Sequence, residues 1–149
     1  MYFMDYAVSF QKSNEYAKVP TKGSPFSAGY DLYAAIPEAI EILPGQVAKI
    51  TTGLKIELPE KTFGAIFARS GLATKQGLAP ANMVGICDSD YRGEYIVALR
   101  NYSSDSQIVR PGDRIAQLII LPYIDVKFIE AGSLEETLRG DGGFGHTGT

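Results

Sequence analysis

The stretch from Asp88 to Gly93 carries the densest set of reactive side chains in the sequence. Asp88 and Asp90 are two residues apart, so both carboxylates lie on one side of an extended chain. Tyr91 and Arg92 follow directly. Two neighbouring carboxylates suit a metal site or general acid–base chemistry. A hairpin in which the acids pair with Arg92 is the structural alternative, and the residues by themselves leave both interpretations open.

A second set of polar residues is suited to bind phosphate. Arg69, Ser70 and Gly71 follow an apolar stretch and open a short predicted helix. Backbone N–H groups at the start of a helix, a hydroxyl and a guanidinium together suit phosphate oxygens. A capped helix with a surface arginine explains the same residues. Gln117 stands inside an otherwise apolar strand, where an amide either completes the structure or binds a ligand.

The last eleven residues, 139–149, differ in composition from the rest of the chain. Five of them are glycine, and Phe144 is their only large apolar side chain. Glycines permit close backbone approach to phosphates, Arg139 offers a bidentate donor, and Phe144 offers a face on which a base can stack. Composition alone also fits a disordered tail, so we expect a flexible C-terminal arm.

Length, cysteine content, net charge and hydropathy exclude several classes of function. The chain has 149 residues, which is the size of a single domain, and we expect one domain spanning 1–149 with its arm at 139–149. Its one cysteine, Cys87, excludes an intrachain disulfide and a metal site of several thiolates. A net charge of -3 argues against nucleic acid as the main partner. No apolar run approaches the length of a membrane span, so we expect a soluble intracellular protein, cytoplasmic and without membrane contact.

The elements that must position these residues are mostly short strands. Period-two alternation, Val, Ile, Tyr and Phe content, and frequent glycine and proline turns predict an all-β fold, a jelly-roll-like sandwich or barrel. Strands are expected at 2–4, 47–50, 54–58, 63–67, 94–99, 116–121 and 124–128. Helices are expected only at 72–77, with Ser70 as the N-cap, and at 133–138.

Five stretches of the chain, in this order and at these distances, closely resemble the five motifs of the trimeric dUTPase family. The resemblance runs from about residue 18 to the C-terminus, and the family fold is a β-clip jelly roll with one short helix. The stretches are Ala28–Leu32, Ala68–Leu72, Gly85–Gly93, Arg110–Leu118 and Arg139–Gly148.

The resemblance implies hydrolysis of dUTP to dUMP and pyrophosphate by water attack on the α-phosphorus. Asp88 matches the residue that orients the water and accepts from the sugar 3′-OH. Tyr91 matches the ring that packs on deoxyribose and leaves no room for a 2′-OH. Asn82 and Gly85 belong to a hairpin whose backbone reads uracil. An aspartate carboxyl is already ionised at neutral pH, so Asp88 is suited to act as a base.

On the phosphate side, the resemblance implies substrate contacts from three segments of the chain. These contacts are expected from Arg69, Ser70, Gly71, Gln117, Arg139, Phe144, Gly145 and His146. Asp31 is expected near the water shell of Mg²⁺ or paired with an arginine. The family holds Mg²⁺ through the triphosphate and water, without direct protein ligands, and assembles as a homotrimer with sites shared between subunits. His146 stands where the family usually has serine, which leaves the role of that position open.

Two alternatives belong to other functional classes. A dCTP deaminase shares the fold and a similar nucleotide, but it needs a glutamate near the pyrimidine, and the stretch from Asp88 to Gly93 favours dUTP. A regulator that binds dUTP and a protein partner without turnover is the non-enzymatic alternative. Release of pyrophosphate or of ammonia separates the three.

Overall fold

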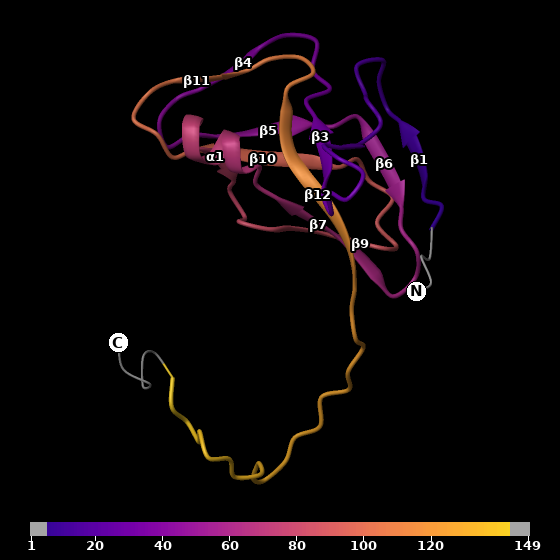
Figure 1. Ribbon diagram of the computed structural model, residues 1–149, viewed down its shortest axis with the longest axis vertical. Helices are drawn as coiled ribbons and strands as arrows, with labels where there is room; N and C mark the ends of the chain where they lie inside the picture. The colour runs from indigo at the N-terminus through magenta and orange to yellow at the C-terminus, as the bar shows by residue number, and fades with distance from the viewer. Residues whose placement is uncertain (1–5, 144–149) are drawn as a thin grey trace.

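The computed structural model describes residues 6–143, and this part of the chain contains twelve β-strands and one short α-helix (Figure 1). The first six strands are β1 (Ser9–Lys12), β2 (Thr21–Lys22), β3 (Tyr30–Tyr33), β4 (Ile40–Ile42), β5 (Val47–Thr51) and β6 (Leu54–Glu57). The others are β7 (Thr62–Phe67), β8 (Leu78–Pro80), β9 (Gly85–Asp88), β10 (Ile96–Asn101), β11 (Gln107–Val109) and β12 (Arg114–Pro122). Helix α1 (Ser70–Gln76) lies between β7 and β8. None of the described helical residues forms a segment long and apolar enough to cross a membrane.

All strand pairs are antiparallel. The largest sheet has the order β2-β3-β12-β7-β9, and a second has the order β5-β10-β8. Two further pairs form separate two-stranded sheets, β1 with β6 and β11 with β4. Buried side chains from these sheets form one core. The mostly β fold with one short helix confirms the predicted fold class.

Alternation of side chains explains which residues enter the core. In β6, Leu54 and Ile56 are buried while Lys55 and Glu57 are exposed, as a half-buried strand requires. Strands predicted at 47–50, 54–58, 63–67 and 116–121 correspond to β5, β6, β7 and β12. The strand predicted at 94–99 begins two residues later, at Ile96.

Three sequence predictions are wrong. No helix forms at 133–138, where Leu134 and Leu138 lie exposed with no surface to pack on, and so short a helix is unstable alone. Residues 124–128 pair with no strand in the described part of the chain. Ser70 is the first helical residue rather than the N-cap: Arg69 occupies the cap position, and no side chain caps the helix. The strand predicted at 2–4 lies outside the described residues.

Asn101 is a fully buried polar residue that fixes the loop after β10. Its Nδ2 donates to the carbonyls of Ile42 (2.8 Å) and Asp105 (2.7 Å). Its Oδ1 accepts from the backbone N–H and the hydroxyl of Ser103. All side-chain donors and acceptors of Asn101 are therefore used, which makes their burial tolerable.

We expect Asn101→Ala to lower the free energy of unfolding by about 2–4 kcal/mol, because it removes the donor to the buried Ile42 carbonyl and the other hydrogen bonds of a fully buried side chain. Urea denaturation measures this change. Ser106→Ala, which removes an exposed hydroxyl that bonds Glu41, is the control and should change stability by no more than about 0.5 kcal/mol. A loss at Asn101 no larger than that of the control would contradict this role.

Candidate functional site

A groove of about 380 Å³ opens where β3, β12 and the end of β7 meet. We call it the donor groove, because several hydrogen-bond donors of the chain line it. Its lining residues are Gly23, Ser27, Ala28, Gly29, Asp31, Arg69, Ser70, Gly71, Arg114, Gln117 and Ile119. It therefore brings together the predicted Asp31, Arg69, Ser70, Gly71 and Gln117.

The charges of the donor groove are organised around Asp31. The Arg69 Nε lies 2.7 Å from Asp31 Oδ1, and the Arg114 Nη1 lies 3.4 Å from Oδ2. The Asp31 side chain is only 13% exposed, whereas Arg114 is about half exposed. Two guanidinium groups thus share one carboxylate, which leaves net positive charge at the groove.

Sequence reasoning did not single out Arg114. Arg114 begins β12, three residues before Gln117. This short spacing on one strand is the feature of the sequence that could have indicated a shared site. A register shift between Arg114 and Ala116 turns the chain here, so simple alternation does not predict on which side the guanidinium lies.

Gln117 is held by its neighbours on both sides. Its Nε2 donates to the Ala68 carbonyl at 2.8 Å, and its side chain packs against Gly29. A Cβ at Gly29 would overlap Gln117 Oε1 and lie 3.3 Å from Cδ, so the absence of a side chain at Gly29 is required for this position of the amide. The register that pairs Gln117 with both Asp31 and Phe67 places it in the centre of the groove wall.

The remaining candidates lie on the connection between β8 and β9, on β9 itself and on the loop after it; we call Asn82, Gly85, Asp88 and Tyr91 the β9 cluster. Asp88 is exposed at the end of β9. The loop closes on itself: the Tyr91 N–H donates to the Asp88 carbonyl at 3.1 Å. Arg92 donates to the Ser89 carbonyl and also reaches Glu57, so its guanidinium does not neutralise Asp88. The hairpin alternative, in which the acids pair with Arg92, is not what the loop adopts.

Within one chain the donor groove and Asp88 are well separated. Asp88 pairs with Phe63, while Gln117 pairs with Phe67, four residues further along β7. Strand geometry gives about 13 Å along β7 and about 10 Å across it, so Asp88 and Gln117 are roughly 16 Å apart. The two clusters do not form one site within a single chain.

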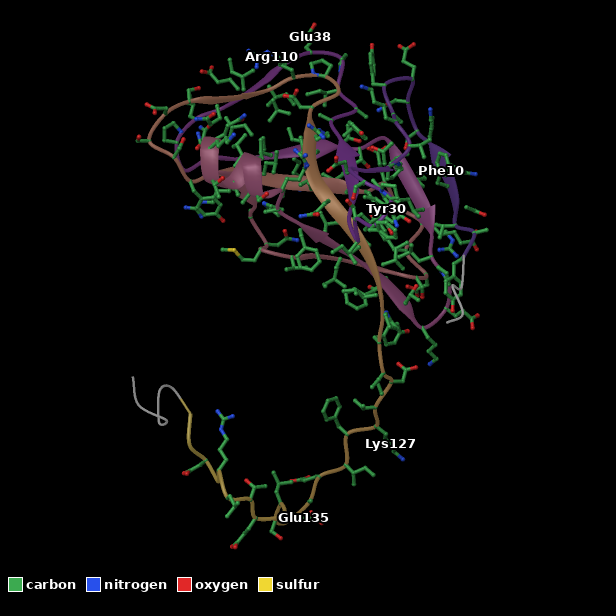
Figure 2. The ribbon with its side chains drawn as sticks, viewed as in Figure 1. Phe10, Tyr30, Glu38, Arg110, Lys127 and Glu135 are labelled. Atoms are coloured by element: carbon green, nitrogen blue, oxygen red, sulfur yellow. The ribbon has the colours of Figure 1, made fainter. Side chains whose placement is uncertain are left out.

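Arg139 lies on the arm that leaves the sheets after β12, and its Nε donates to the Gly142 carbonyl at 2.9 Å (Figure 1). Lys127 and Glu135 mark the course of this arm, which lies apart from the sheets (Figure 2). Phe144, Gly145 and His146 lie outside the described residues.

Comparison with known proteins decides the family. A family model described as dUTPase matches residues 15–148. The chain belongs to the dUTPase family. This family member is 50% identical over 142 residues to the deoxyuridine 5′-triphosphate nucleotidohydrolase of Desulfitobacterium hafniense, covering 95% of the chain and 94% of that protein. It is 44% identical to the enzyme of the same name from Acinetobacter baumannii, over 87% of each chain.

Solved structures support the fold of this family member. The dUTPase of Staphylococcus bacteriophage 80alpha, solved with dUpNHpp, superposes with a TM-score of 0.89 at 23% identity, covering 97% of this chain and all of that one. The dUTPase of phage phi11 of S. aureus, whose structure describes a coordinated structural Mg(II) ion, gives a TM-score of 0.80 at 22% identity, covering 88% of this chain and all of that one. At these identities the two structures bear on the fold alone.

Cys87 is adjacent to Asp88 in sequence but faces the core. Burial raises the pKa of its thiol to about 11, the contact with the Tyr95 hydroxyl lowers it, and the Asp88 carboxylate raises it further. A thiol with this pKa is protonated at neutral pH, so Cys87 is not suited to act as a nucleophile.

We expect iodoacetamide to modify Cys87 about 100-fold more slowly in the folded protein than in the unfolded one at pH 8. At pH 8, the rise of the pKa from 9.0 to about 11 reduces the thiolate from about 9% to about 0.1% of the population. Mass spectrometry measures the modification, with protein in urea as the control. Equal rates in both states would show that this thiol is neither shielded nor shifted.

Proposed function

We propose that water activated by Asp88 attacks the α-phosphorus in the reaction that this chain performs, the hydrolysis of dUTP to dUMP and pyrophosphate. The observation that carries the proposal is the donor groove, in which two arginines, a helix start and a fixed amide surround a space suited to a triphosphate. It lies on a chain 50% identical to deoxyuridine 5′-triphosphate nucleotidohydrolases.

Phosphate binding follows from the chemistry of the groove. The backbone N–H groups of Ser70 and Gly71 begin α1, where the first N–H groups have no intrahelical acceptor. The Ser70 hydroxyl is exposed and free to donate. Arg69, held by Asp31, and Gln117, held by Ala68, direct their remaining N–H groups with little loss of conformational freedom. These donors stabilise the negative charge that develops during attack.

The groove fits a Mg²⁺ ion held by the substrate. Asp31, the one carboxylate that lines it, already pairs with two arginines and is poorly placed to serve as a direct ligand. Mg²⁺ usually keeps several waters and binds substrate phosphates, so the triphosphate and water would hold it, with Asp31 near its water shell. When bound, the ion neutralises phosphate charge.

The β9 cluster would bind the nucleoside and supply the base. Asp88 is exposed, and within residues 6–143 its carboxylate has no hydrogen-bond or ion-pair partner that competes with a water or a sugar 3′-OH. Tyr91 presents a half-exposed ring for the deoxyribose. The turn at Asn82, where the Val84 N–H donates to the Asn82 carbonyl, leads into Gly85 at the start of β9, and backbone groups of this connection would bind uracil.

A homotrimer with shared sites resolves the separation of about 16 Å between the two clusters. A site that needs both Asp88 and the donor groove is complete only when different copies supply them. The sheet face between the clusters supports such packing, because it is apolar. It carries Phe63, Phe67, Ile86, Ile119 and Leu121, which the strand register places on one side.

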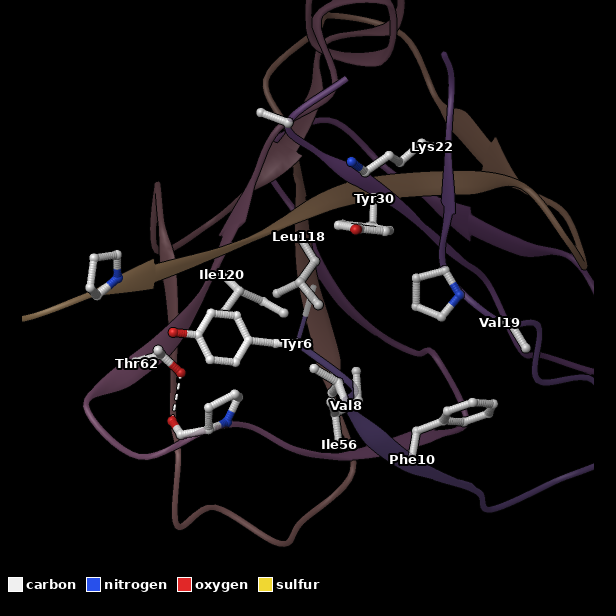
Figure 3. A pocket seen from close by; sticks show the side chains of 14 residues that line it. Tyr6, Val8, Phe10, Val19, Lys22, Tyr30, Ile56, Thr62, Leu118 and Ile120 are labelled. Carbon is white, nitrogen blue, oxygen red and sulfur yellow. Dashed lines mark hydrogen bonds between the residues drawn. The ribbon is translucent and has the colours of Figure 1, made fainter. Parts of the chain in front are cut away.

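The arm and an apolar groove also favour assembly. Ile124, Phe128 and Leu134 on the arm are almost fully exposed, which a lone chain in water does not favour. A groove of about 780 Å³ lies beside the base of the arm, with Tyr30, Leu118 and Ile120 among the side chains that line it (Figure 3). Both surfaces would be covered in an assembly of several copies.

We assign the segment 139–149 as a flexible part of the single domain that closes over the bound nucleotide. Arg139, exposed on the arm, would reach the terminal phosphate. Phe144 would stack on the base, and Gly145 and His146 would donate to phosphate oxygens. Its high glycine content makes the segment costly to order, so closure should require the triphosphate.

We expect Asp88→Asn to lower the rate of pyrophosphate release from dUTP with Mg²⁺ about 100-fold or more, because the amide keeps the shape but not the base. Binding of dUpNHpp should change by less than about fivefold. Asp90→Asn is the matched control and should retain activity within about threefold of the parent. Activity of Asp88→Asn within that same range would remove Asp88 from the mechanism; release of ammonia would instead identify a deaminase.

The shared site is tested by mixing two inactive chains, one with Asp88→Asn and one that ends at Leu138. If Asp88 and the arm of one site come from different subunits, random mixing leaves about a quarter of the sites with both. Activity should therefore rise well above that of either parent, once native mass spectrometry shows mixed assemblies. Mixed assemblies without recovered activity would contradict shared sites.

A further inference from the structure

Tyr95 is a buried aromatic residue directly beneath the loop that carries Tyr91. It is 1% exposed and precedes β10. Its ring centroid lies 6.1 Å from that of Tyr91, with 30° between the ring planes, which is within the range of a favourable aromatic pair. The ring of Tyr95 therefore supports one side of the Tyr91 ring.

Gly93 leaves the space that the hydroxyl end of the Tyr91 ring occupies. A Cβ at Gly93 would overlap the Tyr91 hydroxyl and Cζ, and would lie 2.7 Å from Cε2. The Tyr91 hydroxyl, held above Gly93, donates to the Glu94 carbonyl at 3.1 Å. The Tyr91 ring thus occupies a space bounded by a bare glycine, a carbonyl group and a buried ring.

The main chain around Tyr95 is anchored to a different part of the fold. The Tyr95 N–H donates to the Leu54 carbonyl at 2.7 Å, and its carbonyl accepts from the N–H and the hydroxyl of Thr52. The preceding residue, Glu94, accepts from the hydroxyl of Thr51. Tyr95 is consequently held by Thr52 and Leu54, at the connection between β5 and β6, rather than by the loop of Tyr91.

The hydroxyl of Tyr95 contributes little to this support. Among the described residues it has no hydrogen-bond partner of normal geometry, and the thiol of Cys87 is its polar neighbour. Burial raises the pKa of Tyr95 far above its ordinary value, and the nearby Cys87 raises it further, so the side chain stays neutral. What Tyr95 offers to Tyr91 is the face of its ring.

We propose that Tyr95 and Gly93 are positioning residues. They hold the Tyr91 ring in the position in which it admits deoxyribose and excludes ribose. Neither residue touches the substrate; both act through Tyr91. The proposal rests on the proposed function, in which Tyr91 packs on the sugar. Selectivity against UTP then depends on a buried residue outside the sugar contact.

Tyr95→Met tests the support from below, because methionine fills core space without offering a rigid ring face. The contact between Tyr91 and the sugar exists before and during reaction, so the KM for dUTP should rise about two- to tenfold with kcat nearly unchanged. The ratio of UTP to dUTP hydrolysis, measured as kcat/KM by pyrophosphate release, should increase. Tyr95→Phe keeps the ring and should restore most of the parent selectivity.

Gly93→Ala tests the same ring from the other side, and Gly93 has no left-handed backbone that an alanine would strain. Its Cβ should displace Tyr91 and shift KM and the UTP to dUTP ratio in the same sense as Tyr95→Met. Tyr102→Leu is the matched control: it removes a half-exposed tyrosine that lies on Arg100, and should leave both quantities unchanged. If Tyr95→Met does not melt cooperatively, Gly93→Ala decides the question.

Combination with Tyr91→Ala separates this inference from the proposed function. With Tyr91 removed, Tyr95→Met should alter the UTP to dUTP ratio by less than about twofold, because the ring it supports is absent. Parent selectivity in folded Tyr95→Met and in Gly93→Ala, while Tyr91→Ala loses it, would overturn the positioning role alone. Parent selectivity in Tyr91→Ala itself would instead refute the proposed sugar contact.

Discussion

Strand β7 lies between β12 and β9, and its register on both sides determines where the polar residues of the site are placed. One end of β7 aligns with Gln117 and, through β12, with Asp31; the other end aligns with Asp88. A shift of one residue in either pairing would turn these side chains to the opposite face. Ile66 and its partner Leu118 on β12 oppose such a shift, because both are buried in the core and the shift would turn one of them away from it.

The electrostatics of the donor groove depend on one half-buried carboxylate. Asp31 orients Arg69 through a short hydrogen bond and draws Arg114 toward the same point. One negative charge therefore organises two positive ones, which leaves a net charge suited to an anion. Gln117 is oriented differently, by a backbone carbonyl and by the space above Gly29. Charge and close packing thus place neighbouring donors by separate means.

Much of this fold can be predicted from the sequence, because several strands alternate apolar and polar residues. Leu54 and Ile56 alternate with Lys55 and Glu57, and no knowledge of neighbours is needed to assign the strand. The helix expected at 133–138 fails for the opposite reason: its composition suits a helix, but it has no surface on which to pack. The assignment of Gln117 and Asp31 to one site comes from family motifs, and only the register explains why they meet. Contacts such as that of Tyr95 with Tyr91 depend on how distant segments pack, and spacing along the chain does not reveal them.

The arm is anchored to Lys61 where it leaves the body. The Tyr123 N–H donates to the Lys61 carbonyl at 3.1 Å, and Lys61 also forms an ion pair with Asp125. Tyr123 and Arg139 are sixteen residue steps apart, so the chain between them can span up to about 53 Å. A guanidinium tethered in this way acts at an effective concentration on the order of millimolar, whatever the concentration of the protein. A free peptide with the sequence of the arm would have to reach that concentration to replace it, so weak individual contacts are sufficient for closure.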